Sequence, residues 1–357
     1  MCSSDLFFDA SPEHALVNPD NLHILVDHVK CAAFELPFST TEQYGRHDVQ
    51  DVLGVLAEGG FVHRVADDGG DDGLWQWTNE SYPADAVSLR AISSDNFVVV
   101  DITGDHRIIG EVAFTAALTT LHEKAIYLHD ARQFQVERFD YEGRKAYVRQ
   151  VDSDYFTDAI DYTQVKELEA FESAEVSGAG ACYGDVRLNR QIVGFKKVKF
   201  YTMENVGSGH LSMPEQEMHT TAFWLHFPEA FLARFPDLTP TEKQSGLVGL
   251  GALLRTIGAL RVMCDPRDLG VSITEAIAGG LTSFEPNLYL YDNYPGGIGQ
   301  SAPLFKMRRK LLEGAAELLR GCACEAGCPS CVGPIGEVGE RGKETAGRLL
   351  AELLATP

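Results

Sequence analysis

Four cysteines near the C-terminus have a spacing that can bind a metal ion. They follow the pattern C-x-C-x3-C-x2-C and are Cys322, Cys324, Cys328 and Cys331. Four thiolates can surround one Zn²⁺ tetrahedrally and leave no coordination position for water. The spacing therefore predicts one structural zinc site and no reaction at the metal.

Two other interpretations of these cysteines remain open. In a C-x-x-C redox centre the attacking cysteine starts a helix that follows a strand, whereas a helix is expected before Cys322. Buried cysteines that share no ligand are the other alternative. A zinc ion would connect a helix ending near Arg320 to one beginning near Glu340, so metal binding would contribute to folding.

A glycine-rich loop from Tyr291 to Gly299 follows a short apolar strand and precedes a helix. This order resembles a phosphate-binding loop. The Lys-Ser/Thr pair of a P-loop is absent, however, and Pro295 removes one amide donor. We expect the glycines to allow close backbone approach and Asp292 to act as a turn former or hydrogen-bond acceptor.

Two basic stretches stand out and supply the candidate nucleic-acid-binding residues. The first lies in residues 186–203, which lack acidic residues, and its candidates are Arg187, Arg190, Lys196, Lys197, Lys199 and Tyr201. The second begins a predicted helix, and its candidates are Lys306, Arg308 and Arg309. Cations beside aromatic rings can bind single-stranded nucleic acid through phosphate neutralisation and base stacking. Solvated basic faces, with the aromatic rings in the core, are an equal alternative.

The sequence contains no recognisable catalytic set. The eleven histidines are dispersed, and neither H-E-x-x-H nor G-x-S-x-G occurs. No carboxylate pair is distinguished by its surroundings. We therefore assign no catalytic residue and expect the chain not to be an enzyme on its own.

The elements that position these residues indicate an α+β multidomain protein. Residues 1–86 show two helices and a two-stranded wing, an order typical of an acidic winged-helix-like domain. Residues 87–160 contain short β-branched or aromatic strands and predict a small β-rich domain. Residues 161–357 are expected to form a helical C-terminal zinc-binding domain with the four-cysteine knuckle.

Within the last domain, the pattern predicts both helices and strands. Expected helical stretches are 165–175, 245–262, 303–319 and 340–354. Expected strands are 184–188, 195–203 and 288–291.

The formal charge of −22 is distributed unevenly. Residues 1–86 carry 16 acidic residues against three basic ones. This composition favours a packing or protein-contact role for the winged helix over DNA binding. Since no apolar run reaches the length of a membrane span and the N-terminus lacks a signal-peptide pattern, we expect a cytoplasmic protein without a membrane partner.

The chain resembles the C-terminal half of the YprA/MrfA-type superfamily 2 (DEAD/DEAH-box) DNA helicases, whose hallmark is a four-cysteine MrfA zinc-binding domain. The matching strings occur in family order along most of the chain. They are residues 18–21, 28–37, 146–149, 154–157, 194–197, 218–225, 291–299 and the cysteine knuckle.

The resemblance implies a non-catalytic, DNA-guiding and zinc-stabilised region of an ATP-dependent DNA-repair helicase, with single-stranded DNA and RecA-like motor domains as partners. The Walker A, DExH and arginine-finger motifs of those motors are absent from this sequence. The motor would therefore lie upstream in cis or act in trans. The alternative is an interaction scaffold that docks a separately encoded helicase or ATPase subunit. A thiol oxidoreductase is a third hypothesis.

Overall fold

The computed structural model describes residues 18, 21–45, 47–65, 73–87, 96–275 and 284–355. The chain divides into two compact units. The N-terminal unit comprises Pro19–Tyr162 and Arg190–Glu215, and the C-terminal unit comprises Met1–Asn18, Thr163–Asn189 and Gln216–Pro357. Two long strands, β11 (Tyr155–Val176) and β12 (Ala179–Lys199), contribute residues to both units. The domain boundaries at residues 86 and 160 stay predictions.

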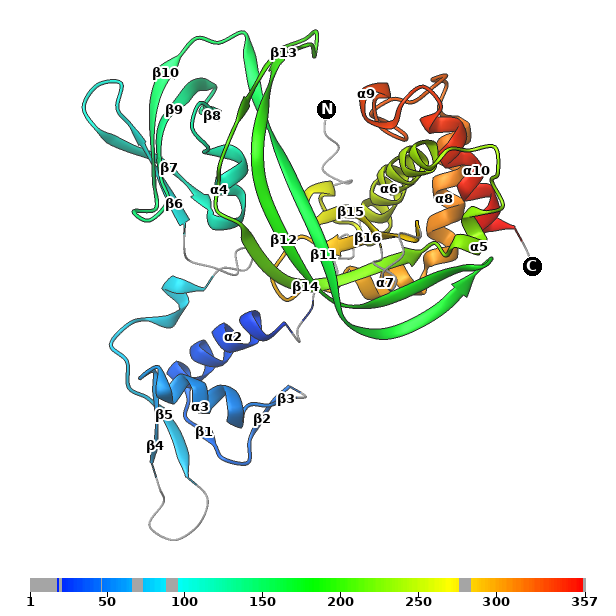
Figure 1. Ribbon diagram of the computed structural model, residues 1–357. Coiled ribbons are helices and arrows are strands. Elements are labelled where there is room, and N and C mark those ends of the chain that lie inside the picture. Colours follow the sequence, from blue (N-terminus) through cyan, green and yellow to red (C-terminus); the bar gives the residue numbers. More distant parts are fainter. Residues whose placement is uncertain are drawn as a thin grey trace, which may run out of the picture. The chain divides into compact units, whose positions relative to one another are not determined.

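The N-terminal unit contains the predicted winged-helix order of two helices and a wing (Figure 1). Its elements are α2 (Leu22–Glu35), β1 (Phe38–Ser39), β2 (Gln43–Tyr44), β3 (His47–Asp48), α3 (Gln50–Glu58), β4 (Val62–Val65), β5 (Leu74–Trp77) and the 3-10 helix η1 (Pro83–Ala86). The Asn21 side chain caps α2. Leu25 and Val29 of α2 share a core with Leu53 of α3. The turn predicted for Asp67 to Gly73 lies, apart from Gly73, outside the described residues.

The same unit contains a five-stranded sheet in the order β7-β6-β10-β9-β8. Its elements are β6 (Asn96–Asp101), β7 (Arg107–Ala113), α4 (Phe114–Thr120), β8 (Ile126–His129), β9 (Arg132–Asp140) and β10 (Lys145–Val151). Phe97, Phe134 and Val148 lie in its core. The five strands confirm the predicted β-rich segment, whereas α4 was not predicted.

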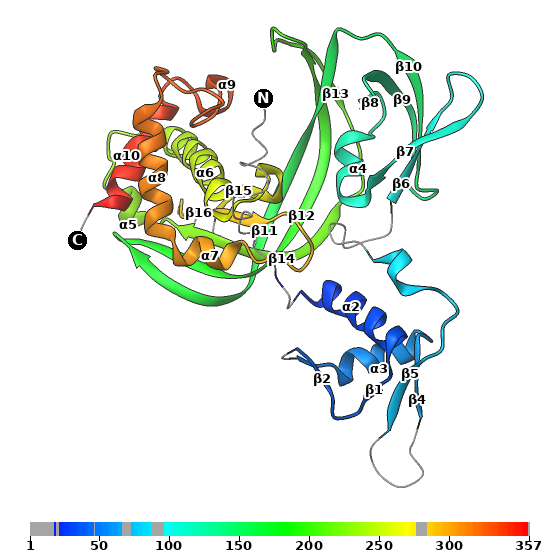
Figure 2. The same cartoon turned by 180° about the vertical axis from the view of Figure 1, so that it is seen from behind.

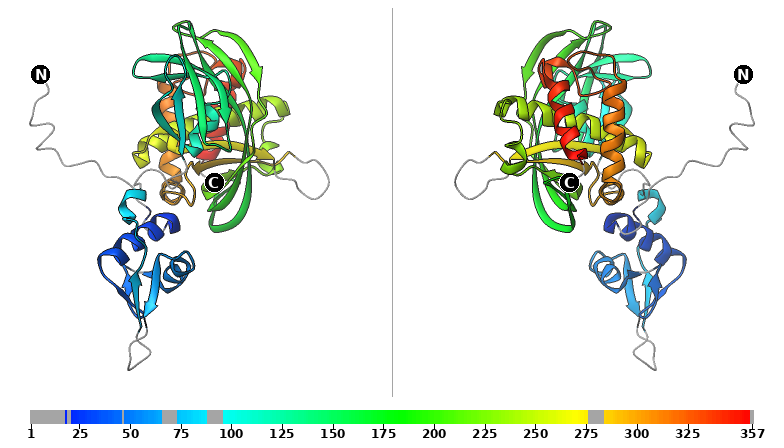
Figure 3. Two further views of the ribbon diagram at one scale, coloured as in Figure 1. Left: turned by 90° about the vertical axis from the view of Figure 1, so that its left-hand side faces the viewer. Right: turned by 90° about the vertical axis from the view of Figure 1, so that its right-hand side faces the viewer.

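A strongly curved sheet forms the framework of the C-terminal unit (Figure 3). The strand order is β11-β12-β14-β16-β15, with β13 paired to the end of β12, and the further strands are β13 (Asn205–His210), β14 (Gln216–His226), β15 (Leu269–Glu275) and β16 (Pro286–Asp292). The first strand contacts the last two, because Ser272 Oγ donates to Thr163 O at 2.9 Å and Tyr289 OH donates to Glu167 Oε1 at 2.7 Å. The concave face encloses an aromatic core that includes Trp224.

Three helices of the C-terminal unit, α6, α8 and α10, pack together and share a second core with the sheet (Figures 1 and 2). The helices of this unit are α5 (Glu229–Leu232), α6 (Pro240–Val262), η2 (Pro266–Asp268), α7 (Ser301–Lys306), α8 (Arg308–Gly321), α9 (Ile335–Val338) and α10 (Gly342–Leu354). A capping box between Thr239 and Glu242 begins α6. The predicted helices at 245–262 and 340–354 are thereby confirmed.

Within the described residues, α6 is the one helix long and apolar enough to span a membrane by length and composition. Its most apolar window has a mean hydropathy of 1.3, and 61% of that window is buried inside the protein. Core helices of globular proteins pass the same test, so α6 is weak evidence for a membrane span.

Three secondary-structure predictions for the C-terminal part were wrong. The stretch 165–175 is not helical but lies in β11, because pairing with β12 outweighs the helix propensity of its Glu, Lys and Ala residues. The strands expected at 184–188 and 195–203 are parts of β12, which continues through the intervening residues and ends at Lys199. The helix expected at 303–319 is interrupted at Met307, whose ψ of 15° separates α7 from α8.

Candidate metal centre and nucleic-acid surfaces

The four cysteines converge on one point between α8 and α10. Their Sγ atoms lie within 4.8 Å of one another. Four of the Sγ–Sγ separations are 3.5 or 3.6 Å. Zinc–sulfur bonds of about 2.3 Å give a tetrahedron whose edges are about 3.8 Å. The thiol cluster therefore fits one zinc ion, as the spacing predicted.

Two positively twisted glycines allow the knuckle to fold tightly. Gly327 has a φ of +148° and Gly333 a φ of +105°. A Cβ atom at Gly327 would lie 2.8 Å from the Gly333 carbonyl oxygen, closer than van der Waals contact permits. The backbone therefore turns back on itself around the cluster, which brings Cys331 into the core at 1% exposure.

The protonation of the thiols is set by hydrogen bonds and burial. A hydrogen bond from the backbone of Cys324, with others from the neighbouring thiols, lowers the pKa of Cys322 to about 7. Burial raises the pKa of Cys331 to about 12. Zinc binds thiolates, so its binding releases protons and weakens as the pH falls.

Lys343, in the first turn of α10, connects that helix to the knuckle. Its Nζ donates to the carbonyl oxygens of Cys322 and Cys324 at 2.7 and 2.5 Å, and its backbone N–H donates to Ala326 O at 3.1 Å. No sequence pattern links this lysine to the cysteines, so it was not predicted. The ammonium group holds the first part of the knuckle and places a positive charge beside the thiolates.

Replacing Lys343 with methionine is expected to weaken zinc binding by about 10- to 100-fold, the usual effect of losing an outer partner of metal ligands. Methionine keeps the apolar stem but loses the two hydrogen bonds to the ligand carbonyls. Zinc release to a chromogenic chelator measures the change. Lys310→Met, an exposed position on α8, is the control. Equal release from both variants would exclude a role of Lys343 at the knuckle.

The glycine-rich loop after β16 surrounds an internal carboxylate. Asp292 is fully buried, and its Oδ2 accepts hydrogen bonds from the backbone N–H groups of Ile298, Gly299 and Gln300 at 3.0, 3.1 and 3.2 Å. Thr221 Oγ1 and Ser301 Oγ donate to the same carboxylate at 3.2 and 2.9 Å. Burial raises the pKa of Asp292, and these hydrogen bonds oppose the increase.

This arrangement confirms the structural interpretation of the loop. The three backbone N–H groups that would cradle a phosphate in a P-loop are used by Asp292. Gly297, at a φ of +71°, approaches the neighbouring strand so closely that a Cβ would lie 2.5 Å from Thr221 Oγ1. Asp292 is thus a hydrogen-bond acceptor, as predicted.

The first set of candidate nucleic-acid-binding residues is divided between the two units. Arg187 belongs to the C-terminal unit and pairs with Glu217 at 3.8 Å. Arg190 belongs to the N-terminal unit and pairs with Asp161 at the same distance. The structure therefore does not place these two arginines in one compact unit.

The remaining candidates of this set lie on the β12–β13 hairpin of the N-terminal unit. Alternation along β12 places Lys197 and Lys199 on one face and Lys196 on the other. The Lys197 Nζ lies 4.9 Å from the centre of the Tyr155 ring, and Lys199 pairs with Asp154 at 3.8 Å. Tyr201 is fully exposed in the hairpin turn, at a φ of 67°.

Two aromatic residues of this stretch are not available for stacking on a ligand. Phe195 is buried at 2% exposure and its ring stacks on His122, with ring centres 4.9 Å apart. The Phe200 ring packs on Phe156. The alternative that the aromatic rings lie in the core therefore holds for these two, and Tyr201 remains as the exposed ring.

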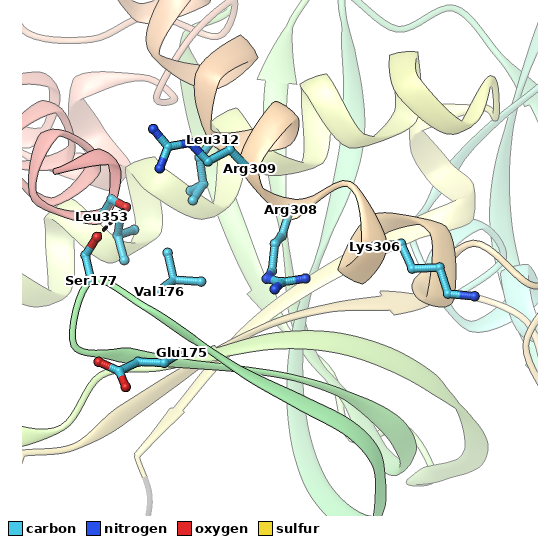
Figure 4. Close-up of a pocket in the computed structure, with 8 residues that line it drawn as sticks. All are labelled: Glu175, Val176, Ser177, Lys306, Arg308, Arg309, Leu312 and Leu353. Atoms are coloured by element: carbon cyan, nitrogen blue, oxygen red, sulfur yellow. Dashed lines mark hydrogen bonds between the residues drawn. The ribbon is translucent and has the colours of Figure 1, made fainter. Parts of the chain in front are cut away.

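The second set of candidates lines a pocket of the C-terminal unit (Figure 4). Lys306 ends α7, while Arg308 and Arg309 begin α8. The Arg308 guanidinium donates to Phe305 O at 3.0 Å and lies 4.8 Å from the centre of that ring. Arg309 pairs with Glu313 at 3.1 Å. The structure thus brings these three cations to one concave surface.

Two family models match the chain. The MrfA Zn-binding domain matches residues 250–332, which include the four cysteines. The winged helix domain of the ATP-dependent helicase HRQ1 matches residues 17–92.

Similarity to longer helicases extends over most of the chain. The chain is 42% identical over 352 residues to the ATP-dependent helicase YprA of Bacillus subtilis. It is 27% identical over 332 residues to the helicase HRQ1 of Saccharomyces cerevisiae. These matches cover 98% and 88% of this chain but 45% and 29% of the relatives. The chain therefore spans less than half the length of either protein.

A solved structure of the DUF1998 helicase MrfA is similar at 38% identity and a TM-score of 0.64, over 98% of this chain and 46% of that one. MrfA bound to DNA is similar at 40% identity and a TM-score of 0.53, over 98% and 45%. The matched region is the C-terminal half of these helicases, and it carries the winged helix and the zinc-binding cysteines found here. As a counterpart of that C-terminal half, the chain belongs to the YprA/MrfA-type family of superfamily 2 DNA helicases.

Proposed function

We propose that this chain is the DNA-guiding region of an ATP-dependent DNA-repair helicase and performs no ATP hydrolysis itself. In this proposal it acts in the cytoplasm, binds single-stranded DNA and works beside RecA-like motor domains supplied in cis or in trans. The observation that supports it most is the similarity, over 98% of the chain, to a helicase crystallised with DNA.

The β12–β13 hairpin provides the surface for this role. Lys197 and Lys199 lie on one face and can neutralise phosphates. Tyr201, at the tip, offers a fully exposed ring on which a base can stack. A non-glycine residue in the left-handed region is held there at an energetic cost, which the turn bears while presenting this ring. The hairpin thus combines the two interactions that hold a single strand.

Replacing Lys197 and Lys199 together with glutamine is expected to weaken binding of a dT oligonucleotide. Each phosphate contact to a single strand contributes about 0.7 to the slope of log affinity against log salt, so loss of two contacts lowers the slope by about 1.4. Fluorescence anisotropy over a salt series measures both quantities.

Two single variants serve as comparisons for the double variant. Lys196→Gln, on the opposite face of β12, is expected to have a smaller effect than the double variant. Lys145→Gln, an exposed lysine of the same unit, is expected to have none. An unchanged slope in the double variant would exclude the hairpin as the binding surface.

An interaction scaffold that docks a separate motor subunit is the second candidate. The acidic winged helix favours it, since residues 1–86 carry 16 acidic residues and three basic ones. Such a surface repels DNA but can bind a basic protein surface. Co-purification with a RecA-like ATPase, without DNA binding by this chain, would select this function.

A further inference from the structure

The pocket beside α8 has the size of a small-ligand site. Its volume is about 300 Å³, at the lower end of the range for small-molecule pockets. It is lined by Glu175, Val176, Ser177, Lys306, Arg308, Arg309, Leu312 and Leu353, all from the C-terminal unit. This space accommodates one nucleotide-sized group and not a folded partner.

The wall opposite α8 is fixed by hydrogen bonds. Ser177 sits in the β11–β12 turn, and its Oγ donates to the carbonyl oxygens of Leu353 and Ala355 at 3.1 and 2.6 Å. Arg234 donates to Ser177 O at 2.8 Å and to Glu352 Oε1 at 2.6 Å. The turn is therefore tied to the end of α10, so the pocket is already formed without a ligand.

The other wall is cationic. Three of the lining side chains are positively charged and one, Glu175, is negative, whereas the chain as a whole carries −22. Figure 4 shows the Arg308 guanidinium turned toward β11 and the Lys306 amine turned away from it. The hydrogen bond and ring contact to Phe305 hold Arg308 in this position. A half-buried, fixed guanidinium is suited to a phosphate, which it binds through paired hydrogen bonds.

The remaining lining is apolar. Val176 comes from β11, Leu312 from α8 and Leu353 from α10. An inorganic anion alone would leave these side chains without a partner, whereas a sugar or base attached to the phosphate would cover them. The combination favours a ligand with one phosphate and an apolar portion.

We propose that this pocket binds one nucleotide unit, with Arg308 as the main phosphate ligand and Arg309 and Lys306 as additional cations at its rim. The nucleotide can be a unit of a DNA strand or a free mononucleotide. The preferred source, a DNA strand, rests on the proposed DNA-guiding function. The site itself rests on the pocket alone.

The test uses the zinc-loaded 357-residue chain with dTMP and a dT oligonucleotide as probes. Arg308→Gln is expected to weaken binding about tenfold, the effect of losing a charge-assisted hydrogen bond. Lys310→Gln removes one exposed cation from the same helical turn without touching the pocket, and is expected to bind as the unchanged chain does. Isothermal titration calorimetry with each probe gives the affinities.

The two probes separate this proposal from the proposed function. Weakened binding of both probes in Arg308→Gln supports a strand nucleotide, and weakened dTMP binding alone supports a free nucleotide. An unchanged chain that binds dTMP through Arg308 but not the oligonucleotide retains the pocket while rejecting DNA guidance. Equal affinities of Arg308→Gln and the unchanged chain, or no binding of either probe, would overturn the pocket. If Arg308→Gln fails to fold, the exposed Arg309→Gln replaces it in the same comparison.

Discussion

Replacing Cys331 with alanine is expected to abolish zinc binding and to unfold the knuckle between α8 and α10. Structural zinc sites contribute about 10 kcal/mol or more near neutral pH, which is comparable with the about 5 to 15 kcal/mol net stability of a domain. Cys331 is the buried member of the cluster, so its loss also leaves a cavity beside Val332. Zinc content by mass spectrometry, with thermal unfolding by circular dichroism, measures the effect.

Cys264→Ala is the matched control for this prediction. Cys264 is a partly buried cysteine that packs on the same core but lies outside the cluster, and burial raises its thiol pKa to about 11. This variant is expected to retain one zinc per chain and nearly unchanged unfolding. A Cys331→Ala protein that keeps stoichiometric zinc and its melting temperature would show that the four thiols do not hold the metal together.

Replacing Asp292 with alanine is expected to destabilise the C-terminal unit by about 3 to 5 kcal/mol, because it leaves several buried donors without an acceptor. The affected donors are the backbone N–H groups of Ile298, Gly299 and Gln300 and the hydroxyls of Thr221 and Ser301. Urea unfolding, followed through the fluorescence of the buried Trp224, measures the change in stability.

Asp292→Asn refines the same prediction. The amide oxygen can take the place of Oδ2 and accept from the loop N–H groups, so the cost is expected to fall to about 1 to 2 kcal/mol. Asp265→Asn, at an exposed carboxylate that pairs with Arg267, is expected to change stability by less than about 1 kcal/mol. Similar values for Asp292→Ala and Asp265→Asn would mean that Asp292 does not organise the loop.

The knuckle and the Asp292 loop were predictable because local sequence encodes them. The spacing of the cysteines fixes which thiols can reach one ion, and the helices on either side follow from apolar periodicity. Likewise, the glycines of the loop and its missing P-loop lysine already indicated a structural role. What local sequence did not reveal was that Asp292 itself fills the backbone cradle, since this depends on how the loop folds back onto β16.

The basic surfaces could be predicted only as sets of residues. Alternation along a strand separates Lys196 from Lys197, but the strand had first to be recognised as continuous through residues 189–194. The break at Met307 that brings Lys306 and Arg308 to one pocket arises from packing, as no Pro or Gly marks it. Ser177 and Leu353, which complete the pocket, are far from α8 in sequence and come together only in the tertiary fold.

The central claim is that this chain guides DNA for a helicase motor, and a chimera tests it most directly. The chain replaces the corresponding half of Bacillus subtilis YprA, to which it is 42% identical, and ATP-dependent unwinding of a duplex with a single-stranded tail is measured. The account predicts that the chimera unwinds DNA and that Lys197→Gln with Lys199→Gln strongly slows unwinding while Lys145→Gln does not. Equal unwinding rates for the chimera and its double variant would contradict it.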